Sequence, residues 1–460
     1  MRHKNFKCPP KLKVGINHKH KSQILICSQE KLFYSRVRVY LTQNENFKKE
    51  PMLDAHCANI LINREKVGKI CKMDTSTIAI IAIIMRRMRR KRIHSRYAKR
   101  YYLNLDYDEK KRRDRRIPRL ALVEPKMSAW KKIYSSGNDQ SLITTTGLDF
   151  NVFKELKQRF EPEYSRYSLV PIEGKYVKVK DKSGRRRLIN GEDCLGLVLV
   201  WSRTRGSLAF LQVIFGLSRT SVEVYLRFGK RLLIKLLSRD VNSKIGTPNR
   251  CRVEAYMEAV REKHPALEGV GLAMDGLRLS SEAPGSFVVQ NNYYNGWKHN
   301  HCVASIFVFA PDGTIIFMVT NCAGSQHDST LADLGGIYEK LRVLYEETGV
   351  KCCVDSAFST KNRPYLIKSA QSPAEDEAHK QFCEQATSMR QSAEWGMRLL
   401  QSSFPRMKDK IVMKDTDETR KCIKLFALLS NFRSNCVGIN QIRNVYMPWL
   451  SLKANEILES

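Results

Sequence analysis

Acidic side chains are scarce in this sequence relative to basic ones, and long apolar runs are missing. The 460 residues contain 80 Lys and Arg against 46 Asp and Glu, which gives a formal net charge of +34 at pH 7. A surplus of this size repels itself in a free globule and is typical of proteins that lie against phosphates. The longest apolar stretch, Ile78 to Met85, has about eight residues where a membrane span needs about twenty. The sequence therefore favours nucleic acid over a membrane as the partner.

Paired cysteine spacings are also missing, although the chain has 13 Cys. None falls into the short repeated spacings of a zinc knuckle or a disulfide framework, so we expect a reducing compartment. Cys352 and Cys353 are adjacent, and Cys302 follows two histidines on an expected strand. These positions leave two interpretations open, zinc ligands or buried thiols. The basic cluster follows the apolar run at Ile78 instead of preceding it, and this order predicts no secretory signal.

The first part of the chain, residues 1–125, has no sustained hydrophobic period and is predicted to be a basic, disordered tail. It contains two basic blocks, Arg86 to Arg92 and Lys110 to Arg116. Such blocks are compatible with a nuclear import signal, with an arm that follows phosphates, or with a solvated charge run. We expect a nuclear protein that passes through the cytoplasm before import. Residues 1–72 look least like folded protein, and Met73 is a candidate start.

Residues 126–245 are predicted to form a helical region. Phe150, Phe153, Leu156 and Phe160 recur on one face of a helix. Residues 206–237 are typical of a helix-turn-helix, in which Gly216 ends the first helix and Ser218 caps the second. The basic residues of the second helix then become candidate DNA contacts: Arg219, Arg227, Lys230 and Arg231. Two packed helices with no DNA nearby are the alternative.

Residues 250–450 are predicted to form an α/β domain with a mixed sheet and flanking helices. An apolar strand, Gly269 to Met274, delivers Asp275 at its end. A hairpin follows, with its turn at Pro311-Asp312-Gly313. One helix then crosses to a last buried strand, Val350 to Val354, which ends in Asp355. This order of elements can bring Asp275 and Asp355 side by side at neighbouring strand ends.

Two carboxylates in that position suit Mg²⁺ or Mn²⁺, and a pair of such ions can promote cleavage of a phosphodiester. Glu394, on a helix predicted to begin at Ser372-Pro373, is the candidate third ligand. Ordinary ion pairs with Arg390 and Arg398 are the alternative for Glu394. Asp328 has two open roles, a cap on the crossover helix, which its position favours, or a further metal ligand.

These motifs, in this order, resemble the transposases of the PIF/Harbinger superfamily and the nucleases derived from them. The resemblance is carried by five blocks that span Asp275 to Arg433: Asp275-Gly276, Gly324 to Ser329, Asp355-Ser356, Ala393 to Gly396 and Leu429 to Arg433. Where that family often has Thr-His after Asp-Gly, this chain has Leu277-Arg278. The resemblance implies a ribonuclease H-like fold preceded by a helix-turn-helix, and a catalytic Asp-Asp-Glu triad that corresponds to Asp275, Asp355 and Glu394.

The function that follows is metal-dependent cleavage and joining of DNA at the ends of a transposon. The partners would be double-stranded DNA, at terminal inverted repeats and a target site, and further copies of the chain when it is active. The resemblance also implies a Myb-like accessory protein. A domesticated DNA-binding or regulatory protein that retains the fold without cleavage is the alternative from another class. Binding of RNA is disfavoured because interleaved aromatic platforms are missing.

Overall fold

The computed structural model describes residues 117–171, 176–178, 186–205, 207–368, 376–411 and 416–450. The two basic blocks predicted from the sequence, Arg86 to Arg92 and Lys110 to Arg116, lie outside these residues. The described residues belong to one unit that spans 112–460. None of its described helices is both long enough and apolar enough to cross a bilayer.

The described part begins with helices. Polar side chains at Ser128, Asn138, Asp149, Asn190, Ser218 and Asn249 each accept a backbone N–H and so satisfy the first turn of the helix that follows. The elements are two 3₁₀ turns, Arg119–Ala121 and Pro125–Met127, and the helices α4 (Ala129–Ser135), α5 (Asp139–Thr146), α6 (Phe150–Arg166), α7 (Gly191–Arg203), α8 (Leu208–Phe215), α9 (Arg219–Leu237) and α10 (Arg250–Lys263).

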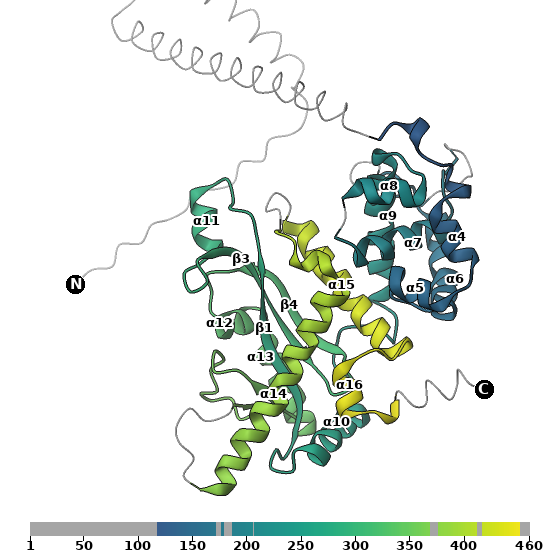
Figure 1. Ribbon diagram of the computed structural model, residues 1–460. Coiled ribbons are helices and arrows are strands. Elements are labelled where there is room, and N and C mark those ends of the chain that lie inside the picture. Colours follow the sequence, from purple (N-terminus) through teal and green to yellow (C-terminus); the bar gives the residue numbers. More distant parts are fainter. Residues whose placement is uncertain are drawn as a thin grey trace, which may run out of the picture. The chain divides into compact units, whose positions relative to one another are not determined.

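Helix α7 forms the centre of this helical region (Figure 1). Its residues from Gly191 to Val200 are all buried, in keeping with the apolar side chains of 194–200. Helix α6 buries Phe153, Leu156 and Phe160 as predicted. Trp130 of α4 is fully buried, and its indole N–H donates to Asp193 of α7 at 3.1 Å.

Helices α8 and α9 are joined by a tight turn whose chemistry follows the sequence prediction. Gly216 has φ of 64°, a left-handed conformation that a residue without a Cβ adopts readily. Leu217 is buried in the turn, and Ser218 accepts the backbone N–H of Ser221. The local geometry therefore supports two helices joined at this point.

A mixed sheet follows. Its strands lie in the order β2 (Tyr294–Asn295), β3 (Asn300–Phe309), β1 (Val270–Ser280), β5 (Lys351–Val354) and β6 (Leu366–Ile367), and β4 (Ile315–Ala323) also pairs with β3. Strand β1 is antiparallel to β3 and parallel to β5. The predicted hairpin is β3 and β4, with Gly313 at φ 79° in the turn. The mixed sheet with flanking helices is thus confirmed, while β2 and β6 were not predicted.

The crossover from β4 to β5 was predicted as one helix, and this is wrong. Two helices are present, α12 (Asp328–Leu334) and α13 (Ile337–Thr348), because Gly335 and Gly336 interrupt the first one and Gly336 takes φ of 68°. Gly349 ends α13 in the left-handed conformation, as expected from its position. The strand that follows, β5, matches the prediction.

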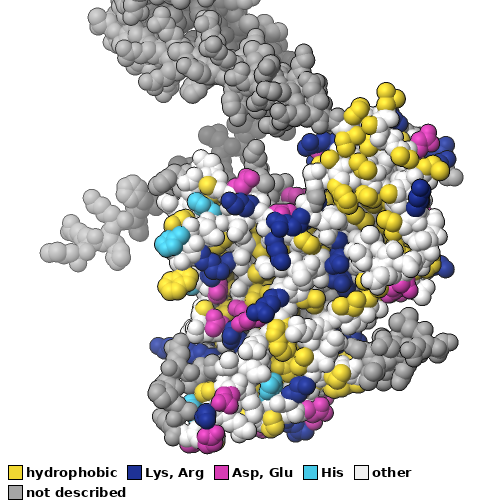
Figure 2. Space-filling view, viewed as in Figure 1, with side chains coloured by type: hydrophobic (Ala, Val, Ile, Leu, Met, Phe, Trp, Pro, Cys, Tyr) yellow, Lys and Arg dark blue, Asp and Glu magenta, His cyan; other side chains and the backbone are white. Residues whose placement is uncertain are grey.

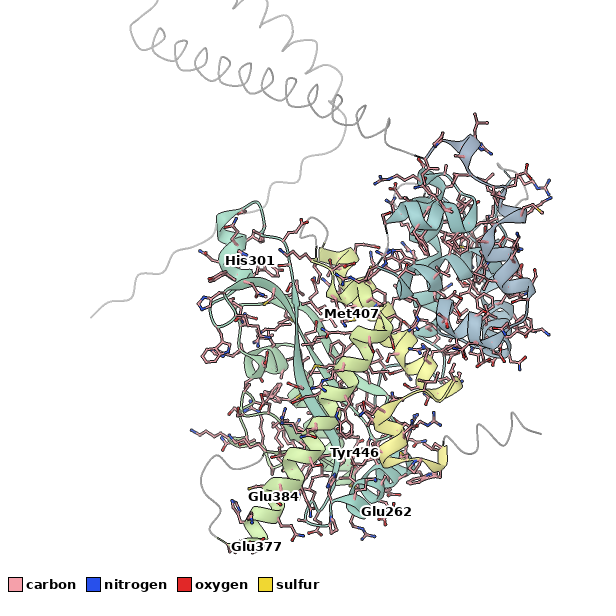
Figure 3. All side chains as sticks on the ribbon, viewed as in Figure 1. Glu262, His301, Glu377, Glu384, Met407 and Tyr446 are labelled. Carbon is pink, nitrogen blue, oxygen red and sulfur yellow. The ribbon has the colours of Figure 1, made fainter. Side chains whose placement is uncertain are left out.

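Helices cover both faces of the sheet (Figure 1). On one face, α14 (Glu377–Ser403) lies against β1 and β3, and α15 (Thr416–Cys436) lies against β4. Tyr446, labelled in Figure 3, belongs to α16 (Gln441–Tyr446), which packs on α14 and α10. The other elements of this region are α11 (Phe287–Tyr293) and a 3₁₀ turn, Pro405–Lys408.

The last block of the resemblance, Leu429 to Arg433, serves the packing of α15. The side-chain amide of Asn431 accepts from the backbone N–H of Ile315 at 2.8 Å and donates to the carbonyl of Ile315 at 2.9 Å, at the start of β4. Arg433 is buried and donates to the carbonyl of Gly147 and to Ser403. These contacts tie α15 to β4, to α14 and to the end of α5, so this block has a structural role.

Candidate active site

The pairing of β1 with β5 brings two carboxylates together. In this parallel ladder Met274 lies opposite Val354, and the next residue on each strand is an acid, Asp275 and Asp355. Neighbouring strands of a sheet are about 5 Å apart. The backbone register therefore places Asp275 and Asp355 side by side, as the sequence predicted.

Asp275 does not end its strand, and this part of the prediction is wrong. Strand β1 continues to Ser280 because β3 pairs with it as far as Ser280 opposite Cys302. Only the pairing with β5 stops at Met274. Asp275 is therefore the first residue of β1 beyond the pairing with β5.

The Asp275 side chain is held in a position that disfavours its charge. Burial, with smaller contributions from the nearby carboxylates of Asp355 and Asp328, raises the pKa of Asp275 to about 6, although the Gly276 N–H and Arg390 act in the opposite direction. Asp275 accepts that N–H at 2.6 Å. Like charges that converge on a partly buried acid are typical of a site that a cation completes.

Asp328 belongs to the opposite side of β1. Its carboxylate fills the space where a side chain at Gly276 would lie, 2.7 Å from an ideal Cβ, and it accepts from Arg278 at 2.9 Å. Side chains alternate along a strand, so Gly276 and Arg278 share the face opposite to Asp275. The predicted cap is wrong, since His327 is the N-cap of α12 and makes no side-chain cap bond. A role for Asp328 as metal ligand stays a prediction, which its pairing with Arg278 does not favour.

Replacing Asp328 by Ala is expected to lower the free energy of unfolding by about 2 kcal/mol, because it leaves the Arg278 guanidinium largely buried and unpaired. The ion-pair side chains are 19% and 10% exposed. The double variant Asp328→Ala/Arg278→Leu should recover part of this loss in urea unfolding. Asp328→Asn should keep nuclease activity within about tenfold. A loss of a thousandfold would instead make Asp328 a metal ligand.

Glu394 lies on α14, which packs against β1, so this glutamate is not on the far side of the sheet from Asp275. Its carboxylate is 33% exposed and accepts from Arg390 at 2.8 Å, with Arg398 3.7 Å away. The surface ion pairs considered as the alternative are thus present. Within the described residues, no three His, Cys, Asp or Glu side chains are arranged to hold a metal ion. Glu394 as third ligand therefore stays a prediction.

Arg390 lies between Glu394 and Asp275 in its interactions, because it acts on both acids. It lies one helical turn before Glu394, with which it pairs, and its positive charge also acts on Asp275. A divalent cation held by Asp275 and Glu394 would supply positive charge to the same two acids. The helix start predicted at Ser372-Pro373 lies outside the described residues, and α14 begins at Glu377 with Asp376 as its cap.

The donors around this site fit a hard divalent cation. Asp275, Asp355 and Glu394 offer carboxylate oxygens, which Mg²⁺ and Mn²⁺ prefer. The cysteines do not take part: Cys302, Cys352 and Cys353 are buried, and burial raises the pKa of each thiol. The interpretation of these cysteines as buried thiols is confirmed.

The four basic residues predicted to contact DNA on α9 differ in their surroundings. Arg219 is exposed and pairs with Glu223 at 3.0 Å, and Arg227 is exposed. Arg231 is exposed and its guanidinium lies 4.9 Å from the centre of the Tyr176 ring. Lys230 is largely buried, pairs with Glu418 of α15 and lies 4.7 Å from the centre of the Trp201 ring. Its charge is engaged within the protein.

A groove that the sequence did not reveal lies beside this face of α9. It has a volume of about 1020 Å³ and is lined by residues of α9 and α15, by Trp201 and by two tyrosines, Tyr167 and Tyr176. Helix α9 also packs against α6, α7, α8 and α15. The predicted recognition helix is therefore held within a helical bundle, and three of its predicted DNA contacts, Arg227, Lys230 and Arg231, line the groove, whereas Arg219 does not.

The comparison with known families agrees with the carboxylate geometry. Residues 274–431 match the family described as DDE superfamily endonuclease. The matched segment begins one residue before Asp275 and contains Asp355 and Glu394. It supports a nuclease-type enzyme that uses a divalent metal and acts on DNA. No curated protein and no solved structure matches the chain.

Proposed function

We propose that this protein is a metal-dependent DNA endonuclease of the transposase type, related to the PIF/Harbinger superfamily, that cleaves and joins strands at terminal inverted repeats. The observation that carries the proposal is the register of β1 and β5, which makes Asp275 and Asp355 neighbours within a segment similar to DDE endonucleases. The pKa of Asp275, raised chiefly by burial and also by the charge of Asp355, fits a carboxylate that a bound cation would stabilise.

Asp275, Asp355 and Glu394 would hold one or two Mg²⁺ or Mn²⁺ ions, which activate the attacking water and stabilise the leaving oxygen of a phosphodiester. Asp275 is fixed on the central strand by pairing on both sides up to Met274. Asp355 accepts the N–H of Ser356 at 2.7 Å, which orients its carboxylate at the strand end. Glu394 comes from the helix packed across this strand, so the three acids have separate supports.

The basic surface would hold the duplex and the helices α8 and α9 would contribute to it. Figure 2 shows Lys and Arg side chains spread over the face of the molecule that carries α15. Of the α9 residues, Arg219, Arg227 and Arg231 remain our candidates for phosphate contacts. Lys230 is less suited because of its contacts with Glu418 and Trp201.

The substitutions Arg219→Ala and Arg227→Ala should each weaken duplex binding and reduce the slope of log K against log salt by about 1, since each removes one phosphate contact. Lys230→Ala provides the matched control: it should lower thermal stability and leave the slope unchanged. Fluorescence anisotropy at several salt concentrations measures both effects. Unchanged slopes for the two arginine variants would show that α9 is only a packing helix.

A domesticated DNA-binding protein without cleavage is the second candidate. The ion pairs that engage Glu394 favour it, because they occupy the acid that the triad needs. The two candidates separate in one experiment, in which the full chain is incubated with supercoiled plasmid carrying the inverted repeats that flank its gene. Nicking that requires Mg²⁺ or Mn²⁺ and stops with a chelator supports the enzyme, and duplex binding without nicking supports the alternative.

The proposed function also includes a cellular location, a number of copies and an accessory protein. We place it in the nucleus, on the strength of the basic blocks and of a DNA substrate. Cleavage of two transposon ends would use at least two copies of the chain. A Myb-like accessory protein is part of the proposal through the family resemblance alone.

A further inference from the structure

The groove beside α9 carries a regular row of cations. Arg227, Arg231 and Lys235 line it at intervals of four residues. Four residues of an α-helix advance the chain by about 6 Å and return to nearly the same side, so these cations form one stripe along the helix. Arg239 continues the stripe just past the end of α9, where it lines a second hollow of about 300 Å³ together with Lys235. The two hollows therefore share one row of positive charge.

Much of the positive charge in this stripe is not neutralised within the protein. The two acids that line the groove, Glu223 and Glu418, each pair with a cation outside the stripe. Among the residues that the structure describes, no carboxylate forms an ion pair with Arg227 or Arg231, and both side chains are exposed. An exposed row of cations without acidic partners attracts an anion, and a row of anions best of all.

Aromatic rings stand beside these cations. The guanidinium of Arg231 lies 4.9 Å from the centre of the Tyr176 ring, and the ammonium of Lys235 lies 4.6 Å from the centre of the Tyr167 ring. Trp201 lines the same groove. These rings come from separate segments of the chain, so the sequence shows no interleaved run of aromatic and basic residues. Only the fold brings cations and rings together in one row.

This repeat of cation and ring matches a nucleic-acid strand better than a peptide. Each nucleotide brings one phosphate for a cation and one flat base for an aromatic ring or a guanidinium plane. An acidic peptide repeats its charges without repeating a flat group beside each of them. The groove volume of about 1020 Å³ lies at the upper end of the range for small-ligand sites, as expected for part of an extended polymer.

The rings favour a single strand over a duplex. The phosphates of either one can reach Arg227 and Arg231, because both side chains are exposed. Tyr167 and Tyr176, in contrast, are half-buried in the wall of the groove. In a duplex the faces of the bases are stacked on one another, so only an unpaired strand can bring a base to these rings.

We propose that the groove of α9 binds a single nucleic-acid strand, whose phosphates meet the stripe of Arg227, Arg231 and Lys235 while its bases stack beside Tyr167 and Tyr176. The contact needs no particular sequence, because every base has a flat face. The inference goes beyond the proposed function and does not depend on cleavage by the carboxylates.

The test measures binding of the full chain to a labelled oligothymidine of about twelve nucleotides by fluorescence anisotropy, without Mg²⁺ or Mn²⁺. Tyr167→Ala/Tyr176→Ala should weaken binding of this strand at least tenfold, because stacking on both rings is lost, and should leave binding of a duplex of the same length within about twofold. Tyr167→Phe/Tyr176→Phe keeps the rings and should bind the strand nearly as the wild type does. Equal weakening for strand and duplex, or none for the strand, would overturn the inference.

The substitution Arg231→Ala gives a second test that leaves the half-buried rings in place. Its loss of one phosphate contact should reduce the slope of log K against log salt for the single strand by about 0.7. Lys263→Ala is the matched control, because Lys263 is an exposed cation of α10 that does not line the groove, and its slope should equal that of the wild type. An unchanged slope for Arg231→Ala would contradict the inference.

Competition against the labelled oligothymidine identifies the occupant. Unlabelled oligouridine of the same length should displace it, because phosphate and base are common to both, and whichever of the two binds more tightly indicates the natural strand. A glutamate peptide of equal charge should displace it at least tenfold less well, since that peptide has no flat groups to stack. Displacement by the peptide as readily as by unlabelled oligothymidine would make the groove a site for acidic protein segments and would overturn the inference.

The endonuclease proposal and this inference fail separately. A chain that nicks no DNA with Mg²⁺ or Mn²⁺, yet binds oligothymidine through the two tyrosines, contradicts the endonuclease alone. A chain that nicks DNA and whose strand binding is unchanged in Tyr167→Ala/Tyr176→Ala contradicts only the single-strand inference.

Discussion

Replacing Asp355 by Asn should reduce nicking by about a thousandfold or more and leave duplex binding within a few-fold of the wild type. The carboxylate would be a direct metal ligand, and a metal ion contributes several kcal/mol of transition-state stabilisation, where each 1.4 kcal/mol is a factor of ten. Asn has nearly the same shape and can still accept the Ser356 N–H that Asp355 accepts now. The measurement is conversion of supercoiled to nicked plasmid with Mg²⁺, beside anisotropy for duplex binding.

Asp333→Asn is the matched control for that variant. Asp333 lies on α12, its side chain is 70% exposed, and its removal changes the net charge by the same amount. Its nicking rate should equal that of the wild type. If Asp355→Asn also nicked at the wild-type rate, the carboxylates of Asp275 and Asp355 would not be the catalytic groups and the chemistry would have to be assigned elsewhere.

Replacing Asp275 by Asn should make the metal-free protein more stable above pH 6. The folded pKa of about 6 is higher than the ordinary value of 3.8, chiefly through burial. Because the folded state holds this proton more tightly than the unfolded chain, stability falls as pH rises from about 4 to about 6 and stays lower above that range. The difference of two pKa units corresponds to about 3 kcal/mol at pH 7.5.

The amide that replaces the Asp275 carboxylate in this variant carries no charge, so the variant avoids this cost. The free energy of unfolding in urea should exceed that of the wild type by up to about 3 kcal/mol at pH 7.5, and the two proteins should converge near pH 4. Mg²⁺ should raise the melting temperature of the wild type and have a much smaller effect on Asp275→Asn. A wild type that is more stable than the variant at pH 7.5 without metal would contradict the electrostatic account of the site.

Much of the fold was predictable because its signals are local. The hairpin of β3 and β4 follows from a Pro-Asp-Gly turn between apolar runs, and the α8–α9 turn follows from Gly216 and Ser218. The residues before Asp275 within β1 and those of β5 before Asp355 are short apolar segments in a chain that is otherwise rich in charge. Each of these patterns is contained in a few neighbouring residues. The handedness of strand connections then restricts the order in which the strands can lie in the sheet.

The partners of the charged side chains were not predictable in the same way. Lys230 meets Glu418, and Arg278 meets Asp328 over Gly276. Each of these pairs joins residues far apart in the sequence, and nothing in either local segment indicates the other. The 92% exposure of Trp297, between β2 and β3, is of the same kind, because no pattern in its own segment indicates it.

The sequence by itself determined which segments are apolar and periodic, where turns interrupt them, and that Asp275 and Asp355 each directly follow a short apolar segment. Those features depend on neighbouring residues alone. The tertiary structure decided that the two strands are adjacent in register, that Asp328 lies on the other face of β1, and that Lys230 pairs with Glu418. These outcomes depend on distances through space, and a charge interacts with whatever the fold places within a few ångströms of it.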